Sequence, residues 1–524
     1  MKKIIYVLSI GLLAFLNLDA QIDKVYQAPE YFEDWNDPTP YPERIMLNLG
    51  EDPATSFSVT WRTDTTIESG IVEYAVATAA PKFWRTKSSQ KAITSTHDFS
   101  KIKSAEIKAN YHTATIENLK PNTLYAYRVG DGSHWSEWIQ YKTASAKPEA
   151  FTFLYVGDAQ NYVLELWSRL IREGYSKAPK SSFIIHAGDL INRAHNDKEW
   201  KEWFSAGGWI HGKVPSIAVP GNHEYRAIEE GGERVLSVQW KPQFNFPLNG
   251  PEGLEETVYY TDYQGVRFIA LNSMARYREK ERKAQMDWLE DVLKNNPNKW
   301  TIATYHHPVF SASQGRDNED WREMLKPLFK KYNVDLALQG HDHSYVRGRT
   351  TPQEYNLVSG VNKQDQTGTV YVVSVSGGKM YNLKPQRWND YEANLEREAE
   401  NTQLFQVITV DGDKLSFESY TVTGELYDAF DLVKNENSPN TFIEKQELAT
   451  SSRYHNNTIS YYDKLPVDIE KDLMVKYKGY KINKVSARLD NGELVYYVEV
   501  ENEKQELDLK LDKTGKVLEE EVDD

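Results

Sequence analysis

The sequence predicts a multidomain protein, with a β-sandwich followed by a layered α/β domain and a small α+β domain at the end. Three observations lead to this prediction. The chain has 524 residues, enough for roughly three domains of about 150 residues each. Short alternating strands fill its first part, and continuous apolar strands alternate with helical patterns in its middle. A helical stretch followed by alternating strands closes the chain.

The first residues have the layout of an export signal. Met1-Lys2-Lys3 is positively charged, Ile4 to Leu18 is an almost unbroken apolar run, and Ala20 is a small residue where cleavage is expected. The alternative is a membrane anchor, but the run is shorter than the roughly 20 apolar residues that a spanning helix needs. We therefore predict a signal peptide over residues 1–20, no membrane span, and a periplasmic or secreted protein.

Residues 41–144 have the pattern of an antiparallel β-sandwich. Ser56 to Trp61 and Gly70 to Tyr74 are short alternating runs separated by Asp, Pro, Gly and Thr turns. Pro121 marks a turn before a strand in which Tyr125 and Tyr127 alternate. This region resembles a fibronectin type III module. Since such modules usually position or recognise other groups, we assign no chemistry to it.

Residues 150–433 are predicted to form the α/β domain, in which five apolar strands end in polar clusters. Strands of this kind are buried on both faces, and ligands gather outside the carboxyl ends of the strands. A single Gly-Asp pair is often an ordinary turn, but five clusters in order predict a metal centre. The clusters are Gly157-Asp158, Gly188-Asp189, Gly221-Asn222-His223-Glu224, His306-His307-Pro308 and Gly340-His341-Asp342-His343.

Composition limits the chemistry of this centre. The chain contains no cysteine, which excludes disulfides, thiolate nucleophiles, Cys-ligated zinc and iron–sulfur clusters. Its formal net charge of −15 argues against binding nucleic acid by general attraction to phosphates. Carboxylate, amide and imidazole ligands suit hard or borderline cations such as Fe, Zn or Mn.

The order of the five clusters resembles that of the calcineurin-like metallophosphoesterase superfamily. With the preceding β-domain, the chain resembles a purple acid phosphatase from about Tyr41 to Lys434. The resemblance implies a layered αββα fold and two divalent or trivalent metal ions. It also implies that a hydroxide bridging the ions attacks the phosphorus. The ligands implied are Asp158, Asp189 and His343 for one ion and Asp189, Asn222, His306 and His341 for the other.

The same resemblance gives two residues a catalytic role. Asp189 would bridge the two ions. His223, which follows Asn222, would stabilise the transition state or protonate the leaving alkoxide.

Two positions depart from the family pattern. Purple acid phosphatases carry an iron-binding tyrosine three residues after the second aspartate, where this chain has Asn192, so no tyrosinate colour is expected. Other members of the superfamily carry a histidine two residues after the first aspartate, where this chain has Gln160. Gln160 and Asn192 are candidates for an amide-oxygen ligand or for holding water, and the identity of the metal stays open.

Residues next to the predicted ligands are candidates for substrate contact. These are His195, His307, Tyr225 and Arg226. The alternative for each is structural, because a histidine beside a ligand can simply donate to a carbonyl and an arginine on a loop is usually solvated. Trp200, Trp203 and Trp209 form an aromatic cluster, which we interpret as packing.

The end of the chain carries little functional signal. Residues 434–465 are polar and are predicted as a linker. Residues 466–524 form a predicted α+β unit with a helix around Ile469 to Tyr477 and a hairpin at Asn491-Gly492. The unit resembles a PepSY-like module, whose partner the sequence does not identify.

These observations predict an exported, dinuclear-metal phosphohydrolase whose substrate is a phosphate ester, with a phosphomonoesterase preferred. A phosphodiesterase on the same site is the alternative, because the leaving group meets loops such as Glu229 to Pro251, whose shape the sequence does not give. A second alternative is a catalytically weak extracellular binding protein, which the incomplete ligand set of the first ion motivates. The six ligands together with His223 favour the enzyme.

Overall fold

The structure is a computed structural model that describes residues 37–523, except residues 230, 312, 314–315, 352–365, 382, 384–387, 436–437, 446–464, 491–492 and 503–504. The predicted signal peptide lies outside the described residues. The chain divides into two units, and the described parts of these units are residues 37–445 and residues 465–523. In the described part of the chain, no helix combines the length and apolar character needed to cross a membrane.

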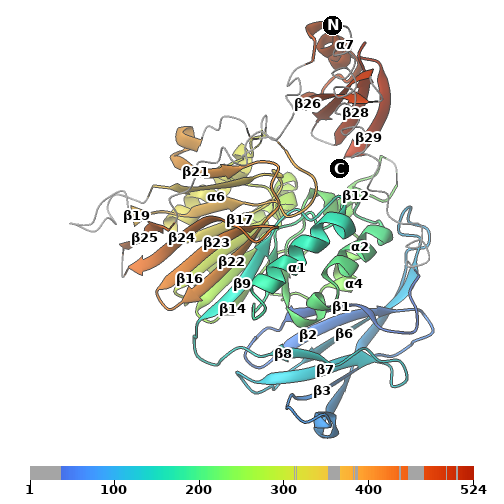
Figure 1. Ribbon diagram of the computed structural model, residues 1–524, viewed down its shortest axis with the longest axis vertical. Helices are drawn as coiled ribbons and strands as arrows, with labels where there is room; N and C mark the ends of the chain where they lie inside the picture. The colour runs from blue at the N-terminus through green and yellow to red at the C-terminus, as the bar shows by residue number, and fades with distance from the viewer. Residues whose placement is uncertain are drawn as a thin grey trace, which may run out of the picture. The chain divides into compact units, whose positions relative to one another are not determined.

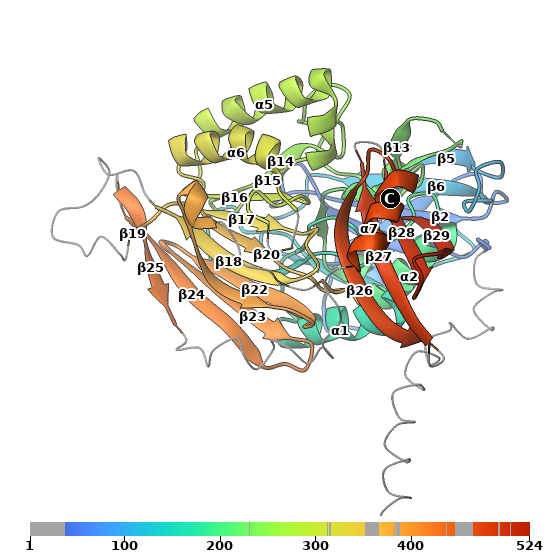
Figure 2. The ribbon, with the colours of Figure 1, turned by 90° about the horizontal axis from the view of Figure 1, so that it is seen from above.

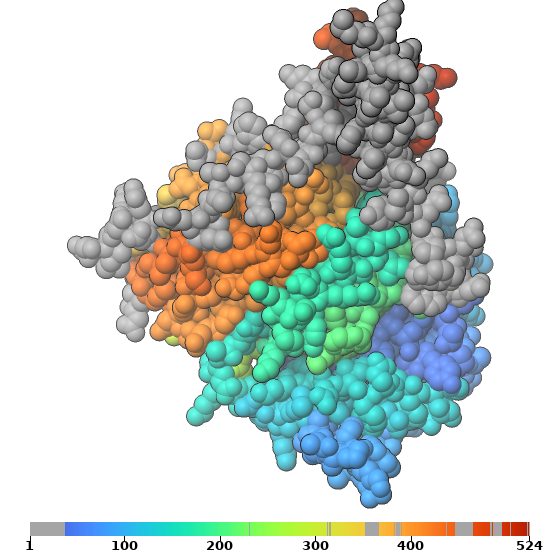
Figure 3. Space-filling model, viewed as in Figure 1, coloured from blue at the N-terminus to red at the C-terminus, as the bar shows by residue number. Residues whose placement is uncertain are grey.

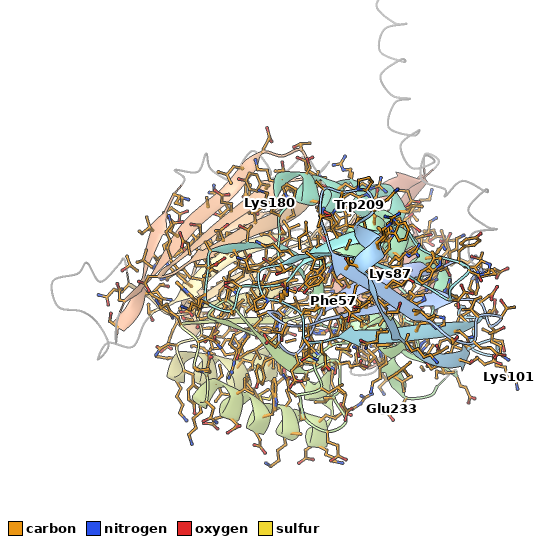
Figure 4. All side chains as sticks on the ribbon, turned by 90° about the horizontal axis from the view of Figure 1, so that it is seen from below. Phe57, Lys87, Lys101, Lys180, Trp209 and Glu233 are labelled. Carbon is orange, nitrogen blue, oxygen red and sulfur yellow. The ribbon has the colours of Figure 1, made fainter. Side chains whose placement is uncertain are left out.

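The first part of the chain is a two-sheet β-sandwich, as the alternating strands predict. Phe57 and Trp61 from one sheet and Val72 and Tyr127 from the other share one apolar core. Figure 4 shows Phe57 inside the domain and Lys101 at its rim. One sheet contains β1 (Glu43–Leu49), β2 (Phe57–Thr63), β5 (Ile93–Asp98) and β6 (Lys108–Ile116); the other contains β3 (Ile71–Val76), β4 (Ser88–Lys91), β7 (Leu124–Gly130) and β8 (Ile139–Lys142), with a short 3-10 helix η3 (Phe83–Thr86).

The sandwich continues into the next domain through a shared sheet. β1 pairs in parallel with β11, with Asn48 opposite Ser216, and this pairing creates one twelve-stranded sheet of order β19-β25-β24-β23-β22-β9-β10-β11-β1-β2-β6-β5. Figure 3 shows the N-terminal strands, in blue, lying against the green helical region on one surface. The remaining strands of this sheet are β9 (Phe151–Val156), β10 (Ile184–His186), β11 (Ser216–Ala218), β19 (Gln366–Thr367), β22 (Leu404–Asp411), β23 (Lys414–Thr421), β24 (Leu426–Asn435) and β25 (Ser438–Glu444).

A second sheet of seven strands packs against the first. Phe153 of β9 meets Phe268 of β15 with ring centroids 5.2 Å apart, so apolar side chains fill the space between the sheets. The strand order is β14-β15-β16-β17-β20-β18-β21, and a separate hairpin pairs β12 (Tyr225–Ala227) with β13 (Arg234–Leu236). The bounds are β14 (Tyr259–Tyr263), β15 (Val266–Ala270), β16 (Trp300–Tyr305), β17 (Leu336–Gln339), β18 (Tyr345–Thr350), β20 (Val370–Val373) and β21 (Ala393–Ala399).

Helices cover the outer faces of both sheets, which gives the predicted αββα layering (Figures 1 and 2). On one side Leu170 of α1 and Trp203 of α2 join the core of the first sheet; on the other, Leu289 of α5 and Trp321 of α6 join the core of the second. The helices are α1 (Ser168–Lys177), α2 (Asp197–Gly207), α3 (Trp209–Lys213), α4 (Trp240–Gln243), α5 (Glu279–Lys294) and α6 (Glu319–Lys331), with a π-helical turn η4 (Val163–Trp167) and 3-10 turns η5 (Asn222–Glu224), η6 (Ser273–Tyr277) and η9 (Trp388–Tyr391).

One strand lies where a linker is expected. β25 falls inside residues 434–465 and pairs with β24, with Leu432 opposite Phe442. Apart from Phe442 it offers few apolar positions, and its other neighbour is the two-residue strand β19. A strand near the edge of a sheet needs little apolar surface, which is why its sequence resembles a linker.

The C-terminal unit is α+β, as predicted. Helix α7 (Val467–Lys476) places Ile469 and Leu473 in a core with Val498 and Leu509. β26 (Lys481–Asp490) and β27 (Glu493–Glu501) pair antiparallel, with Asp490 opposite Glu493, and the predicted turn at Asn491-Gly492 lies outside the described residues. The antiparallel sheet continues with β28 (Glu506–Asp512) and β29 (Val517–Asp523).

Candidate metal centre

The five polar clusters meet because their strands run in parallel. β9, β10 and β11 are neighbours in the first sheet, and β16 and β17 are neighbours in the second, so their carboxyl ends lie together at the same end of each sheet. Backbone bonds join the loops beyond them: Asp158 N donates to Gly188 O at 3.2 Å, and Gly340 N donates to His306 O at 2.9 Å. The sheet pairing thus converts distant sequence motifs into one site.

Two sets of potential ligands share one aspartate. The ligand atoms of Asp189, His306 and His341 lie within 4.8 Å of one another, and so do those of Asp158, Asp189 and His343. Asn222 joins the first set, since its Oδ1 lies 3.1 Å from His306 Nε2 and 3.0 Å from His341 Nδ1. The structure therefore brings together all six residues that the resemblance implies, in the two groups that it implies.

The loops are built to bring these groups close. Asp158, Asp189, His341 and His343 all have positive φ, between 45° and 76°. For non-glycine residues this backbone conformation costs of order 1–3 kcal/mol and is concentrated at functional sites. Gly221 is required for space, because a Cβ there would lie 2.0 Å from Asp189 Oδ1. The chain thus accepts local strain in order to point these side chains at one another.

His306 shows that the first set has too few hydrogens for its acceptors. Its Nδ1 donates to Ala187 O at 2.9 Å, so in the neutral ring Nε2 carries no hydrogen. That Nε2 nevertheless lies 2.9 Å from Asp189 Oδ2 and 3.1 Å from Asn222 Oδ1. His341 Nδ1 lies 3.2 Å from the same His306 Nε2. One additional proton cannot satisfy this set, whereas a cation is attracted to every member of it.

The pKa shifts follow from this crowding. Burial raises the pKa of Asp158 well above its usual value, and the charge of Asp189 raises it further. For Asp189 burial acts in the same direction, but the charges of His306 and His223 bring its pKa below the usual value. Burial would lower the pKa of His306, yet Asp189 raises it to about 9. Without metal, the site therefore holds protons that a cation would replace.

Orphaned oxygen atoms give an independent test of whether metal ions fit. Among the described residues, Gln160 Oε1 and Asn192 Oδ1 are buried and have no hydrogen-bond partner. An orphaned buried acceptor costs about 1–3 kcal/mol and calls for an explanation. Carboxylate, amide and imidazole donors match hard or borderline cations, so the residues present fit metal ions.

A further shell of groups holds the ligands in place. Glu224 accepts hydrogen bonds from Asp189 N at 2.9 Å, Leu190 N at 2.8 Å and Gly221 N at 2.6 Å, which joins the second and third loops. Burial and the neighbouring Asp189 raise the pKa of Glu224 to about 7. His343 Nδ1 donates to Lys379 O at 3.0 Å, which turns Nε2 toward the ligand set.

His223 lies in the same loop as Asn222 and is oriented from two sides. Its backbone N donates to Asp189 Oδ1 at 3.0 Å, and its Nδ1 donates to Asn192 O at 2.7 Å. Asn192 is held in turn, because its N donates to Glu199 Oε2 at 2.9 Å. These bonds fix the ring and its tautomer.

The four candidates for substrate contact differ. His307 lies at the site: its ring centroid is 4.2 Å from that of His341, and its Nδ1 contacts Ser273 Oγ at 2.7 Å. His195 Nε2 donates to the carbonyl of Arg226 at 3.1 Å, and this hydrogen bond connects the two loops that carry these residues. Tyr225 accepts from Asn272 Nδ2 at 2.6 Å, and burial raises the pKa of its hydroxyl to about 12. His307 therefore contacts predicted ligands through its ring.

The sequence analysis missed three arginines at this site. Arg234 Nη2 donates to Asn222 O at 2.8 Å and Arg316 Nη1 to His341 O at 2.8 Å. Arg276 is 5% exposed and Nη1 has no hydrogen-bond partner among the described residues. Burial and then the charges of Arg276 and Arg316 lower the pKa of His307. The three come from separate loops with no shared spacing, so no sequence signal connects them.

Comparison with known proteins agrees with this geometry. Residues 151–345 match the family described as calcineurin-like phosphoesterase, and residues 42–143 match the purple acid phosphatase N-terminal domain. A purple acid phosphatase of Glycine max is 26% identical over 364 residues, covering 65% of this chain and 74% of the relative. The Fe(3+)-Zn(2+) purple acid phosphatase 12 of Arabidopsis thaliana is 24% identical over 361 residues, covering 65% and 73%. The solved structure of a purple acid phosphatase from yellow lupin (Lupinus luteus) seeds has a TM-score of 0.60 at 20% identity and covers 78% of each chain.

Proposed function

We propose that this chain, which carries a calcineurin-like metallophosphoesterase domain and a purple acid phosphatase N-terminal domain, is an exported phosphomonoesterase with a dinuclear metal site. Its similarity to purple acid phosphatases supports a metal-dependent phosphatase. The observation that carries the proposal is the sharing of Asp189 between two sets of potential ligands. One carboxylate shared by two sets of potential ligands is suited to bridge two ions.

The proposed ligands are Asp158, Asp189 and His343 for one ion and Asp189, Asn222, His306 and His341 for the other. When bound, two such ions would withdraw charge from a phosphoryl group and supply a nucleophile from water near neutral pH. Fe, Zn and Mn all suit these donors, and the name of the Arabidopsis relative gives iron and zinc for that protein.

The protein's own residues would bind and orient the substrate around these ions. His223 is fixed through Nδ1, and we assign it the role of stabilising the transition state or protonating the departing alkoxide. Arg234, Arg276 and Arg316 give this end of the domain a positive charge that attracts an anionic ester. His307 is the candidate for a direct contact with the phosphate, since it lies beside His341.

Export rests on the sequence of residues 1–20, whose charged start, apolar run and small residue at the end have the layout of a signal peptide. We propose a periplasmic or secreted location on that basis. Peptide mapping of the protein from its native host tests it: a mature chain that begins near Gln21 is expected, and a chain that retains Met1 would contradict export.

Hydrolysis of two aryl esters tests the function. We expect the metal-loaded full chain to hydrolyse an aryl phosphate monoester faster than the corresponding diester, and Asp189→Ala to lower the rate at least about 100- to 1000-fold, the scale of losing one electrostatic stabiliser. Faster hydrolysis of the diester than of the monoester would favour the phosphodiesterase. Wild-type rates no higher than those of Asp189→Ala on both esters would favour the catalytically weak binding protein and contradict the enzyme.

A further inference from the structure

We propose that the side-chain oxygen of Gln160 is a further ligand of the first ion, and that this centre therefore holds two divalent ions rather than a trivalent and a divalent ion. This inference rests on the proposed function and deepens it. It concerns the position where other members of the superfamily carry histidine, two residues after Asp158.

Gln160 is built into the site. Its backbone N donates to Asp189 O at 3.0 Å, so it is tied to the loop that carries the shared aspartate. Its side chain is fully buried, and its Nε2 lies 2.9 Å from His343 Nε2. Its Oε1 has no hydrogen-bond partner among the residues that the structure describes. A buried acceptor of this kind costs free energy, and at Gln160, unlike in the core, it lies beside a predicted metal ligand.

The tautomer of His343 explains the orientation of this amide. Because His343 Nδ1 donates to Lys379 O, Nε2 of the neutral ring is an acceptor. Without metal, the NH₂ group of Gln160 is the donor that meets this acceptor. When Nε2 is a metal ligand it no longer accepts that bond, and a rotation of the amide by 180° about its last bond presents Oε1 instead. The amide group thus offers a donor without the ion and an acceptor with it.

The charge of the ligands selects the ions. Asp158 and Asp189 are the only carboxylates in the two sets, and the other ligands, Gln160 included, are neutral. Two divalent ions bring four positive charges against these two negative charges, and a trivalent ion adds a fifth. The surroundings are buried and already carry Arg276 and Arg316, so an uncompensated extra charge is costly there. No tyrosinate supplies the missing negative charge, since Asn192 occupies that position.

Metal binding to the full-length protein tests the inference without an activity assay. The protein is depleted of metal with a chelator, titrated with Mn²⁺ by calorimetry, and analysed for metal content. We expect Gln160→Leu to weaken one of two Mn²⁺ sites by about 10- to 100-fold, the range seen when a group supporting a metal is removed. Gln160→Glu, which adds a negative charge, should retain both ions and hold Fe(III) after oxidation and dialysis, which wild type should lose.

Gln406→Leu is the matched control. Gln406 is also a fully buried glutamine with an unpartnered Oε1, but its Nε2 donates to Ser374 Oγ and Ser419 Oγ in the core of the first sheet. Its replacement should leave both Mn²⁺ sites unchanged. Two unaltered Mn²⁺ sites in Gln160→Leu would overturn the inference and leave the proposed function standing, and so would stable Fe(III) in wild type. A wild-type protein that binds no Mn²⁺, Zn²⁺ or iron would instead overturn the proposed function.

Discussion

Two of the buried clusters of charged side chains in the described part of the molecule differ in how their charges are balanced. Where the β-sandwich meets α2, Asp197 accepts from Arg44 Nη2 at 2.8 Å and from Arg62 Nη1 at 3.0 Å, and Glu43 accepts from Arg62 Nε at 2.6 Å. Both carboxylates therefore have cationic partners within the protein. At the candidate metal centre Asp158 instead accepts from the backbone N of His341 at 2.8 Å, and Asp189 accepts from the backbone N of His223 at 3.0 Å and lies 2.9 Å from His306 Nε2.

This difference separates a structural site from a functional one. Guanidinium groups complete the Asp197 cluster, so it needs nothing from outside the protein and stabilises the junction between two domains. At the metal centre, among the described residues, no arginine or lysine pairs with Asp158 or Asp189, and the side chains are held in strained loops. Burial alone does not distinguish the two clusters, because Asp158, Asp189 and Asp197 are all buried. The two clusters are distinguished by their partners: arginines pair with Asp197, whereas the ion-pair partners of Asp158 and Asp189 within the described residues are histidines.

Removing a carboxylate from the complete cluster should have the largest effect on stability. Asp197→Asn leaves Arg44 and Arg62 buried with too little negative charge, and breaking a buried pair in this way costs about 3–5 kcal/mol in the free energy of unfolding. Denaturant unfolding measures this. Asp413→Asn is the control, because Asp413 is an exposed partner of Lys299 and its loss should cost about 1 kcal/mol or less. An equal loss in the free energy of unfolding for the two substitutions would show that the Asp197 cluster does not stabilise the fold.

The corresponding change at the metal centre should have the opposite sign. In metal-depleted protein, Asp158→Asn removes a charge that burial disfavours while keeping an oxygen to accept from His341 N. We expect the free energy of unfolding to rise by about 1 kcal/mol, the scale of a pKa difference of one unit. Metal affinity should fall in the same variant. A loss of stability as large as that of Asp197→Asn would show that Asp158 is a structural residue.

The two clusters should also respond oppositely to pH. Arg44 and Arg62 overcome the effect of burial and lower the pKa of Asp197, so its contribution is present above the unfolded value of about 3.9 and is lost as pH falls through the lower folded value. The pKa of Asp158 is raised, so in metal-depleted protein its cost is absent at low pH and develops as pH rises above about 3.9.

Unfolding experiments between about pH 3 and about pH 8 compare wild type with each of the two variants, over the range that these pKa shifts define. The stability difference between wild type and Asp197→Asn should shrink toward the acid end. The difference between wild type and Asp158→Asn should grow toward the alkaline end. Parallel pH curves for the two variants would contradict the distinction.

A smaller effect is expected at the rim of the metal centre. Arg276 is buried with Nη1 unpartnered and lies close enough to lower the pKa of His307. If it contacts the substrate, Arg276→Gln should raise KM for an aryl phosphate at least about tenfold, because a hydrogen bond to a charged group contributes about 1.5–3 kcal/mol. Metal content should not change. Arg169→Gln, on the exposed side of α1, is the control, and an equal KM in both variants would exclude Arg276 from substrate binding.

The sequence predicts the layered fold and the grouping of the six potential ligands because both follow from local patterns. Apolar strands determine the sheets, and a motif at the end of each strand determines what lies at the edge. Arg234, Arg276 and Arg316 escape prediction because their positions depend on how separate loops fold over the site. β25 escapes prediction because a strand near a sheet edge carries few apolar residues.

Trp200 and Trp203 are fully buried, so the interpretation as packing holds for these two, whereas Trp209 is 55% exposed.

The central claim is that six side chains from five loops enclose two cations through a shared aspartate. Titration of metal-depleted full-length protein with Mn²⁺, followed by metal analysis after dialysis, tests it most directly. We predict two ions per chain for wild type and the weakening of both sites in Asp189→Ala, since Asp189 belongs to both ligand sets. A wild-type protein that binds fewer than two ions, or an Asp189→Ala protein that keeps both with unchanged affinity, would contradict the claim.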